Sequence, residues 1–167
     1  MGASFTFVAI RIFNLMYSKA EVSQLKQEFW TIFGQYMSPL RSADGEKINW
    51  VNYKTGIRQI RFTMQAEKNS AMIAVIITAN DTLTRELYFD QFIQLKHLLK
   101  NELGEDWLWQ SETIDEFGKN ISTISTELTE ASIYKKEDWP QLISFFKPRI
   151  IALDAFWSNV KYGFENL

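Results

Sequence analysis

The chain has 167 residues, the size of one ordinary domain, and its 46% hydrophobic and 15% aromatic content is far too apolar for a disordered protein. Its 18 Lys and Arg against 20 Asp and Glu give a formal charge of -2, which excludes a global positive field for a polyanion but leaves a local basic patch open. Zero Cys and a single His, His97, exclude disulfides and thiolate or multi-histidine metal sites, and we expect neither a metal nor a cofactor.

The N-terminal segment differs from the rest of the chain. It contains the apolar run Phe5 to Ile10 but lacks the basic region and cleavage site of a signal peptide. No segment reaches the roughly 20 apolar residues that a membrane-spanning helix needs. We interpret residues 1–15 as an N-terminal extension or an edge strand, and residues 16–167 as a single cytoplasmic domain without membrane contact.

A capping box marks the first helix. Ser18 and Glu21 have the spacing in which each side chain accepts a hydrogen bond from the other residue's backbone N–H. Apolar residues then recur every three or four positions until Pro39, which cannot continue the hydrogen bonding. The pattern predicts a helix over about 19–37.

Three runs of strand-forming residues follow. They cover Ile48 to Tyr53, Ile57 to Gln65 and Ala71 to Thr78, and their short polar connections suit hairpins. We therefore predict an antiparallel meander. The third run is apolar on both faces, which is typical of a central strand.

A second helix is predicted over about 83–103. Asp81 or Thr82 is the expected cap, and Gly104 is the expected left-handed residue that ends the helix.

Two further strands, Trp107 to Trp109 and Ile121 to Leu128, flank a predicted loop over about 111–120. They bring the expected sheet to five strands.

The last helix begins after Asp138, with Gln141 completing a second expected capping box. Pro148 is expected to kink or split this helix. Its apolar stripe is predicted to be core, with a homodimer face as the alternative, and consists of Leu142, Phe146, Ile150, Leu153, Trp157, Val160 and Phe164. The order of elements is α-β-β-β-α-β-β-α, an α+β domain in which helices cover a mainly antiparallel five-stranded sheet.

Cations and aromatic residues cluster on the first strands. This mixture suits a phosphate backbone with stacked bases. Arg58 and Arg61 are three residues apart, so a regular strand would direct them to opposite faces unless a bulge intervenes. The candidate nucleic-acid contacts, two of them from the last helix, are Trp50, Tyr53, Lys54, Arg58, Arg61, Lys147 and Arg149.

Catalytic motifs are scarce. The strand order up to Trp107 resembles the core of restriction-endonuclease-like nucleases, whose metal site needs an Asp and a Glu-x-Lys set on adjacent strands. Residues 57–65 contain no acid, and residues 71–78 contain neither acid nor lysine. The acidic residues of 112–116 lack the spacing of a cation site. We predict no catalytic residues and no metal site.

Several motifs resemble a bacterial family of unknown function, and the similarity runs from about Met16 to Glu165. The motifs are Trp50, Tyr53-Lys54-Thr55-Gly56-Ile57, Arg61-Phe62, Phe89-Asp90-Gln91-Phe92, Leu95-Lys96, Leu103-Gly104-Glu105, Trp107, Gly118-Lys119, Trp139-Pro140, Phe145-Phe146-Lys147-Pro148-Arg149 and Leu153-Asp154-Ala155-Phe156-Trp157. Members of that family stand alone or follow a nuclease-like region, and the resemblance implies by association a nucleic-acid or defence context. The chain departs from the family pattern at Thr123, where an arginine is common.

These observations together predict a non-catalytic accessory or regulatory binding module in nucleic-acid transactions. The alternative is a protein-interaction or homodimerisation domain that does not bind nucleic acid and uses the aromatic residues of the last helix.

Overall fold

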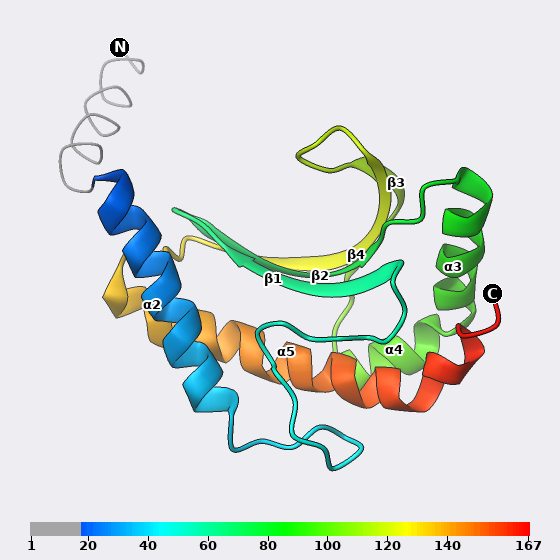
Figure 1. Ribbon diagram of the computed structural model, residues 1–167, viewed down its shortest axis with the longest axis horizontal. Helices are drawn as coiled ribbons and strands as arrows, with labels where there is room; N and C mark the ends of the chain where they lie inside the picture. The colour runs from blue at the N-terminus through cyan, green and yellow to red at the C-terminus, as the bar shows by residue number, and fades with distance from the viewer. Residues whose placement is uncertain (1–17) are drawn as a thin grey trace.

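Four antiparallel strands form one sheet in the computed structural model, which describes residues 18–167 (Figure 1). The strands are β1 (Ile60–Ala66), β2 (Ser70–Ile77), β3 (Leu108–Ile114) and β4 (Asn120–Thr129). Their order across the sheet is β1-β2-β4-β3, so β2 is central, as its apolar sequence predicts, and β1 and β3 form the edges. The interpretation of residues 1–15 as an extension or edge strand lies outside the described residues.

Helices pack mainly against one face of this sheet. They are α2 (Lys19–Met37), α3 (Thr82–Gln94), α4 (Lys96–Leu103) and α5 (Trp139–Val160), with two 3₁₀ turns, η1 (Lys136–Asp138) and η2 (Lys161–Gly163). The long helix α5 runs beneath the sheet in Figure 1 and contacts β1, β2, α2 and α4. The α+β class is confirmed. Among residues 18–167, no helix has the length and apolar character needed to cross a bilayer.

The two faces of the sheet carry different side chains. Phe62 on β1 points toward α5, where its ring centroid lies 5.7 Å from that of Trp157. Its neighbour Arg61 points to the opposite face, because side chains alternate along a strand. Arg61 is paired with Ile76, and Ile76 with Thr123, so these three share the face away from α5. The sheet curls toward β3, which makes this face concave (Figure 1).

The aromatic stripe of the last helix lies in the core. Trp157 exposes 2% of its surface, and Phe156 and Phe164 expose 1% each. Phe92 of α3 stacks against Phe156 and Trp157. These aromatic side chains are therefore covered by the chain itself, as the core interpretation predicts.

Local capping signals are confirmed. Ser18 and Glu21 form both hydrogen bonds of the capping box, and α2 has the predicted bounds. The Asp81 carboxylate accepts a hydrogen bond from the Thr84 backbone N–H at 2.8 Å, which caps α3. Gly104 ends α4 with a φ of 69°, a conformation that glycine adopts without steric cost.

The prediction of a fifth strand over Ile48 to Tyr53 is wrong. The Asn49 side chain accepts hydrogen bonds from the backbone N–H groups of Val51 and Asn52, which folds this segment into a turn. Trp50 is buried, and Ile48, Val51 and Tyr53 are half-buried, although no strand pairs with this segment. The strand-forming residue types here reflect burial of single side chains and not sheet formation.

Three boundaries also differ from prediction. The predicted helix 83–103 is interrupted at Leu95, whose backbone has a ψ of 8° and whose N–H is shared between the Gln91 and Phe92 carbonyl groups. Strand β3 continues to Ile114, because pairing with β4 across a bulge supplies its backbone partners. The predicted loop shrinks to the turn between these strands.

The start of α5 and its proline also need correction. The Asp138 carboxylate accepts from the Ser132 backbone N–H at 2.9 Å and makes no hydrogen bond to the helix, so the predicted capping box with Gln141 is absent. Pro148 lies inside α5 without splitting it.

Candidate nucleic-acid interface

The structure separates the predicted contact residues, beginning with the two aromatic ones. Trp50 exposes 3% of its surface and donates its indole N–H to the Leu40 carbonyl at 3.1 Å. Tyr53 stacks on Phe62 with 5.1 Å between ring centroids and donates its hydroxyl to Asp154. Trp50 is thus inaccessible to a base, and the Tyr53 ring is engaged with the core.

The two cations from the last helix make contacts within the chain. Arg149 donates two hydrogen bonds to the Glu105 carboxylate, at 2.7 and 2.8 Å, and one to the Phe145 carbonyl. The ammonium group of Lys147 lies 4.7 Å above the Tyr36 ring. Lys54 is exposed and lines a separate cavity of about 330 Å³.

Glu105→Gln tests the pair with Arg149. The hydrogen bonds from Arg149 hold the pKa of Glu105 below its ordinary value. The stabilisation is therefore present above the pKa of the unfolded carboxyl, about 4.3, and is lost as the pH falls through the lower folded value. Because both side chains are partly exposed, we expect Glu105→Gln to cost about 1 kcal/mol at neutral pH. Urea unfolding at pH 7 and at about pH 3 checks this, and an equal cost at both values would contradict it.

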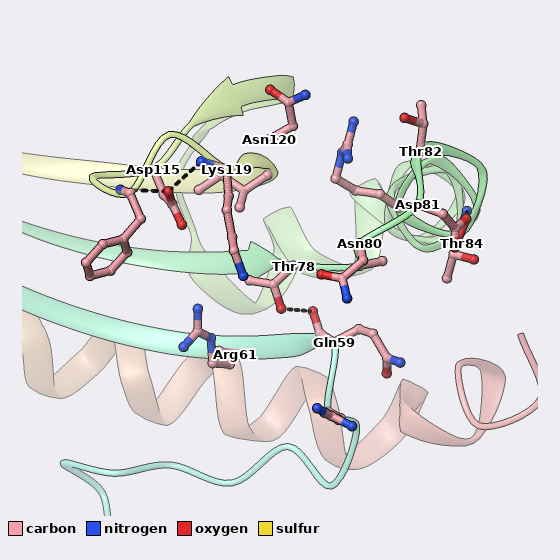
Figure 2. A pocket seen from close by; sticks show the side chains of 15 residues that line it. Gln59, Arg61, Thr78, Asn80, Asp81, Thr82, Thr84, Asp115, Lys119 and Asn120 are labelled. Atoms are coloured by element: carbon pink, nitrogen blue, oxygen red, sulfur yellow. Dashed lines mark hydrogen bonds between the residues drawn. The ribbon is translucent and has the colours of Figure 1, made fainter.

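Arg58 and Arg61 line one cleft of about 1040 Å³. The cleft opens where β1 begins, β2 ends, α3 begins and the turn between β3 and β4 folds back (Figure 2). Cations, amides and hydroxyls dominate its lining, which consists of Arg58, Gln59, Arg61, Thr78, Ala79, Asn80, Asp81, Thr82, Thr84, Arg85, Asp115, Phe117, Lys119, Asn120 and Ile121. It is a polar site suited to an anion.

A turn brings the two arginines together despite their spacing of three residues. Arg58 precedes β1, in a turn where the Ile60 backbone N–H donates to the Ile57 carbonyl at 3.1 Å. Arg61 lies within β1 on the concave face. The regular strand that would separate them begins only at Ile60.

Two further cations join them that sequence reasoning missed. Lys119 extends from the β3–β4 turn toward Thr78 at the end of β2 (Figure 2). Arg85, in the first turn of α3, exposes 3% of its surface. One of its terminal nitrogens lies 3.4 Å from the Glu112 carboxylate, and its Nε has no hydrogen-bond partner among residues 18–167. Lys119 belongs to the Gly118-Lys119 motif, which could have pointed to it, whereas Arg85 carries no distinctive local signal.

The two carboxylates of the cleft are engaged with the backbone. Asp81 caps α3, and the hydrogen bond from Thr84, assisted by the charge of Arg85, lowers the pKa of Asp81. Asp115 accepts hydrogen bonds from the backbone N–H groups of Phe117 and Lys119, both at 2.9 Å. Within residues 18–167, no group of three or more acidic or histidine side chains has the geometry of a metal site.

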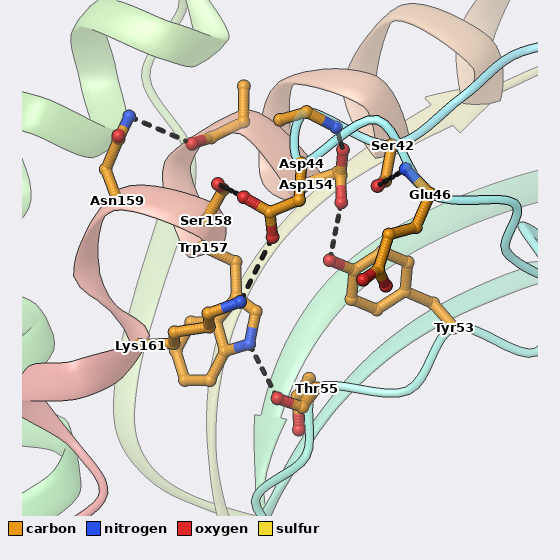
Figure 3. A network of polar contacts seen from close by, with 12 residues as sticks. Ser42, Asp44, Glu46, Tyr53, Thr55, Asp154, Trp157, Ser158, Asn159 and Lys161 are labelled. Atoms are coloured by element: carbon orange, nitrogen blue, oxygen red, sulfur yellow. Dashed lines mark hydrogen bonds and ion pairs between the residues drawn. The ribbon is translucent and has the colours of Figure 1, made fainter.

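A second polar cluster anchors the segment before β1 to α5 (Figure 3). Asp154 exposes 5% of its surface and accepts hydrogen bonds from the Ala43 backbone N–H and the Tyr53 hydroxyl, both at 2.7 Å. Burial, reinforced by this hydrogen bond, raises the pKa of Tyr53 far above its ordinary value, so the phenol stays protonated. Trp157 donates its indole N–H to the Thr55 carbonyl at 2.8 Å. This cluster is structural.

A family model described as Domain of unknown function (DUF4268) matches residues 25–161. The chain belongs to this family. The resemblance to a family of unknown function is thereby confirmed. No curated protein and no solved structure matches the chain.

The motifs of this DUF4268 chain contact one another across the fold. Asp154 of the L-D-x-F-W motif accepts from Tyr53 of the Y-K-T-G-I motif. Glu105 of the L-G-E motif accepts from Arg149 of the F-F-K-P-R motif. These two pairs give four of the motif residues a role in holding the fold together. Two other motif residues, Arg61 and Lys119, line the cleft.

Proposed function

We propose that this DUF4268 domain is a non-catalytic module that binds the phosphate backbone of a nucleic acid in the cleft. The observation that carries the proposal is the convergence of Arg58, Arg61, Arg85 and Lys119, from three separate segments, on one cleft. Cationic side chains supply most of the free energy of nucleic-acid binding, because they displace the counterions of the phosphates.

The local charge supports this proposal although the chain as a whole carries a formal charge of -2. The cleft places four cations against two carboxylates, Asp81 and Asp115, which both accept hydrogen bonds from backbone N–H groups. Within residues 18–167, the buried guanidinium of Arg85 makes one ion pair, with Glu112 at 3.4 Å, and it also interacts electrostatically with Asp81. A buried charge that is weakly paired is costly. A phosphate group entering the cleft would compensate that charge.

Binding fits the lining better than catalysis does. Guanidinium, ammonium, amide and hydroxyl groups are donors that hold phosphate oxygens. The one histidine of the chain, His97, lies exposed on α4, away from the cleft lining. An accessory or regulatory role in nucleic-acid transactions is the context that the resemblance described above implies by association. The alternative, a protein-interaction or homodimerisation domain, relied on the aromatic residues of the last helix, and Phe156, Trp157 and Phe164 are buried in the core.

Arg61→Gln is expected to weaken nucleic-acid binding and flatten its salt dependence. Each phosphate contact contributes about 0.7 to the slope of log affinity against log salt for a single strand and about 0.9 for a duplex. Fluorescence anisotropy with labelled DNA and RNA at several salt concentrations measures this slope. Arg41→Gln, which removes an exposed arginine outside the cleft, is the matched control. An unchanged slope for Arg61→Gln, or equal losses in both variants, would contradict the assignment.

A further inference from the structure

We propose, resting on the function above, that the bound nucleic acid is single-stranded and that one of its bases stacks on Phe117. Phe117 lines the cleft and exposes 81% of its surface. It stands two residues before Lys119, so one turn presents an aromatic ring and a cation together.

The turn between β3 and β4 fixes the backbone that carries this ring. Asp115 accepts hydrogen bonds from the backbone N–H groups of Phe117, Gly118 and Lys119, and its own N–H donates to the Lys119 carbonyl. Gly118 has a φ of 78°, which a side chain at that position would disfavour. The ring is therefore carried on a hydrogen-bonded turn, so little backbone freedom is lost when a ligand contacts it.

The position of the ring distinguishes it from other exposed apolar side chains. Single exposed hydrophobic residues are common on protein surfaces and by themselves indicate nothing. Phe117, however, shares its cleft with Arg58, Arg61 and Lys119. Sites for single strands combine such a cationic groove with aromatic rings on which bases stack.

The exposed ring also favours a single strand over a duplex. In a duplex both faces of a base are already covered by its neighbours, so stacking on Phe117 would require unstacking that costs a few kcal/mol per step. A single strand offers its base faces without that cost. Sequence analysis predicted the aromatic contact with a base at Trp50 and Tyr53, but both side chains pack within the fold. We assign this contact to Phe117 instead.

Three variants and three nucleic-acid probes, a single strand, an abasic strand and a duplex, test this inference by fluorescence anisotropy. Base stacking on an aromatic side chain contributes about 1–3 kcal/mol, so Phe117→Ala should weaken binding of single-stranded DNA or RNA roughly 5-fold to 150-fold. The salt slope should stay unchanged, because no phosphate contact is lost. Phe117→Trp should retain affinity, and Tyr162→Ala, which truncates an exposed aromatic side chain outside the cleft, should behave as the wild type.

The three probes separate the contribution of base stacking to the affinity from that of the phosphate charges. An abasic strand carries phosphates without bases, so it should bind the wild type and Phe117→Ala equally. A duplex should bind more weakly than a single strand of the same length. The stacking inference would be overturned if Phe117→Ala bound a single strand as tightly as the wild type does, or if the wild type preferred the duplex. In either case, a salt slope that still depends on Arg61 would leave the proposed function standing. Failure of the wild type to bind any of these strands would overturn both.

Discussion

Asp154→Ala is expected to lower the free energy of unfolding by about 2–4 kcal/mol. The Asp154 carboxylate accepts two hydrogen bonds of 2.7 Å, from the Ala43 backbone N–H and from the Tyr53 hydroxyl. Alanine removes the acceptor of both part-buried hydrogen bonds, and each lost partner costs about 1–3 kcal/mol. The anchor between α5 and the segment before β1 would be weakened at its centre.

Urea unfolding followed by circular dichroism checks this value. Tyr53→Phe should cost less than Asp154→Ala, because the carboxylate keeps the Ala43 N–H as a donor. The double variant should cost less than the two single variants added together, since they share one hydrogen bond. Additive costs, or a loss below about 0.5 kcal/mol for Asp154→Ala, would contradict the structural role of this cluster.

Reversing two charges in the cleft, Arg61→Glu with Lys119→Glu, should weaken nucleic-acid binding by about 100-fold or more at moderate salt. Both side chains line the cleft and both are exposed, so the change removes two phosphate contacts and adds two repulsive carboxylates. Neither side chain contributes to the hydrophobic core, and the far-ultraviolet circular dichroism should remain that of the wild type.

A matched double variant controls for net charge. Arg41→Glu with Lys47→Glu changes the formal charge by the same amount, at exposed positions outside the cleft. We expect a much smaller loss of affinity from this pair, because charges beyond about 10 Å are largely screened at 0.1 M salt. Equal losses in the two double variants would show that the overall charge, and not the cleft, governs binding.

Several helix ends could be predicted from sequence because they are fixed locally, although the interruption of the second helix at Leu95 could not. Ser18 and Glu21, three residues apart, cap the start of α2, and Gly104 ends α4 because glycine adopts the left-handed conformation without help from distant residues. The number of strands could not be predicted in this way, since a strand requires a partner. The segment from Ile48 to Tyr53 has the residue types of a strand, but the Asn49 side chain accepts hydrogen bonds from the backbone N–H groups of Val51 and Asn52, and no strand pairs with it.

The site was only partly predictable for a related reason. Arg58 and Arg61 are close in sequence, whereas Lys119 reaches the cleft through the pairing of β4 with β2, which juxtaposes distant segments. Aromatic residues raise a second difficulty, because composition does not distinguish a buried ring from an exposed one. Trp50 lies in the core, while Phe117, within a segment predicted as a plain loop, is exposed in the cleft.

The most direct test of the cleft as a phosphate-binding site is the affinity of the wild-type protein for a single strand as a function of salt. Three exposed cations line the cleft, Arg58, Arg61 and Lys119. Each phosphate contact on a single strand contributes about 0.7, so the slope of log affinity against log salt should be about -2. A slope near zero, or no binding at about 50 mM salt, would contradict the proposal.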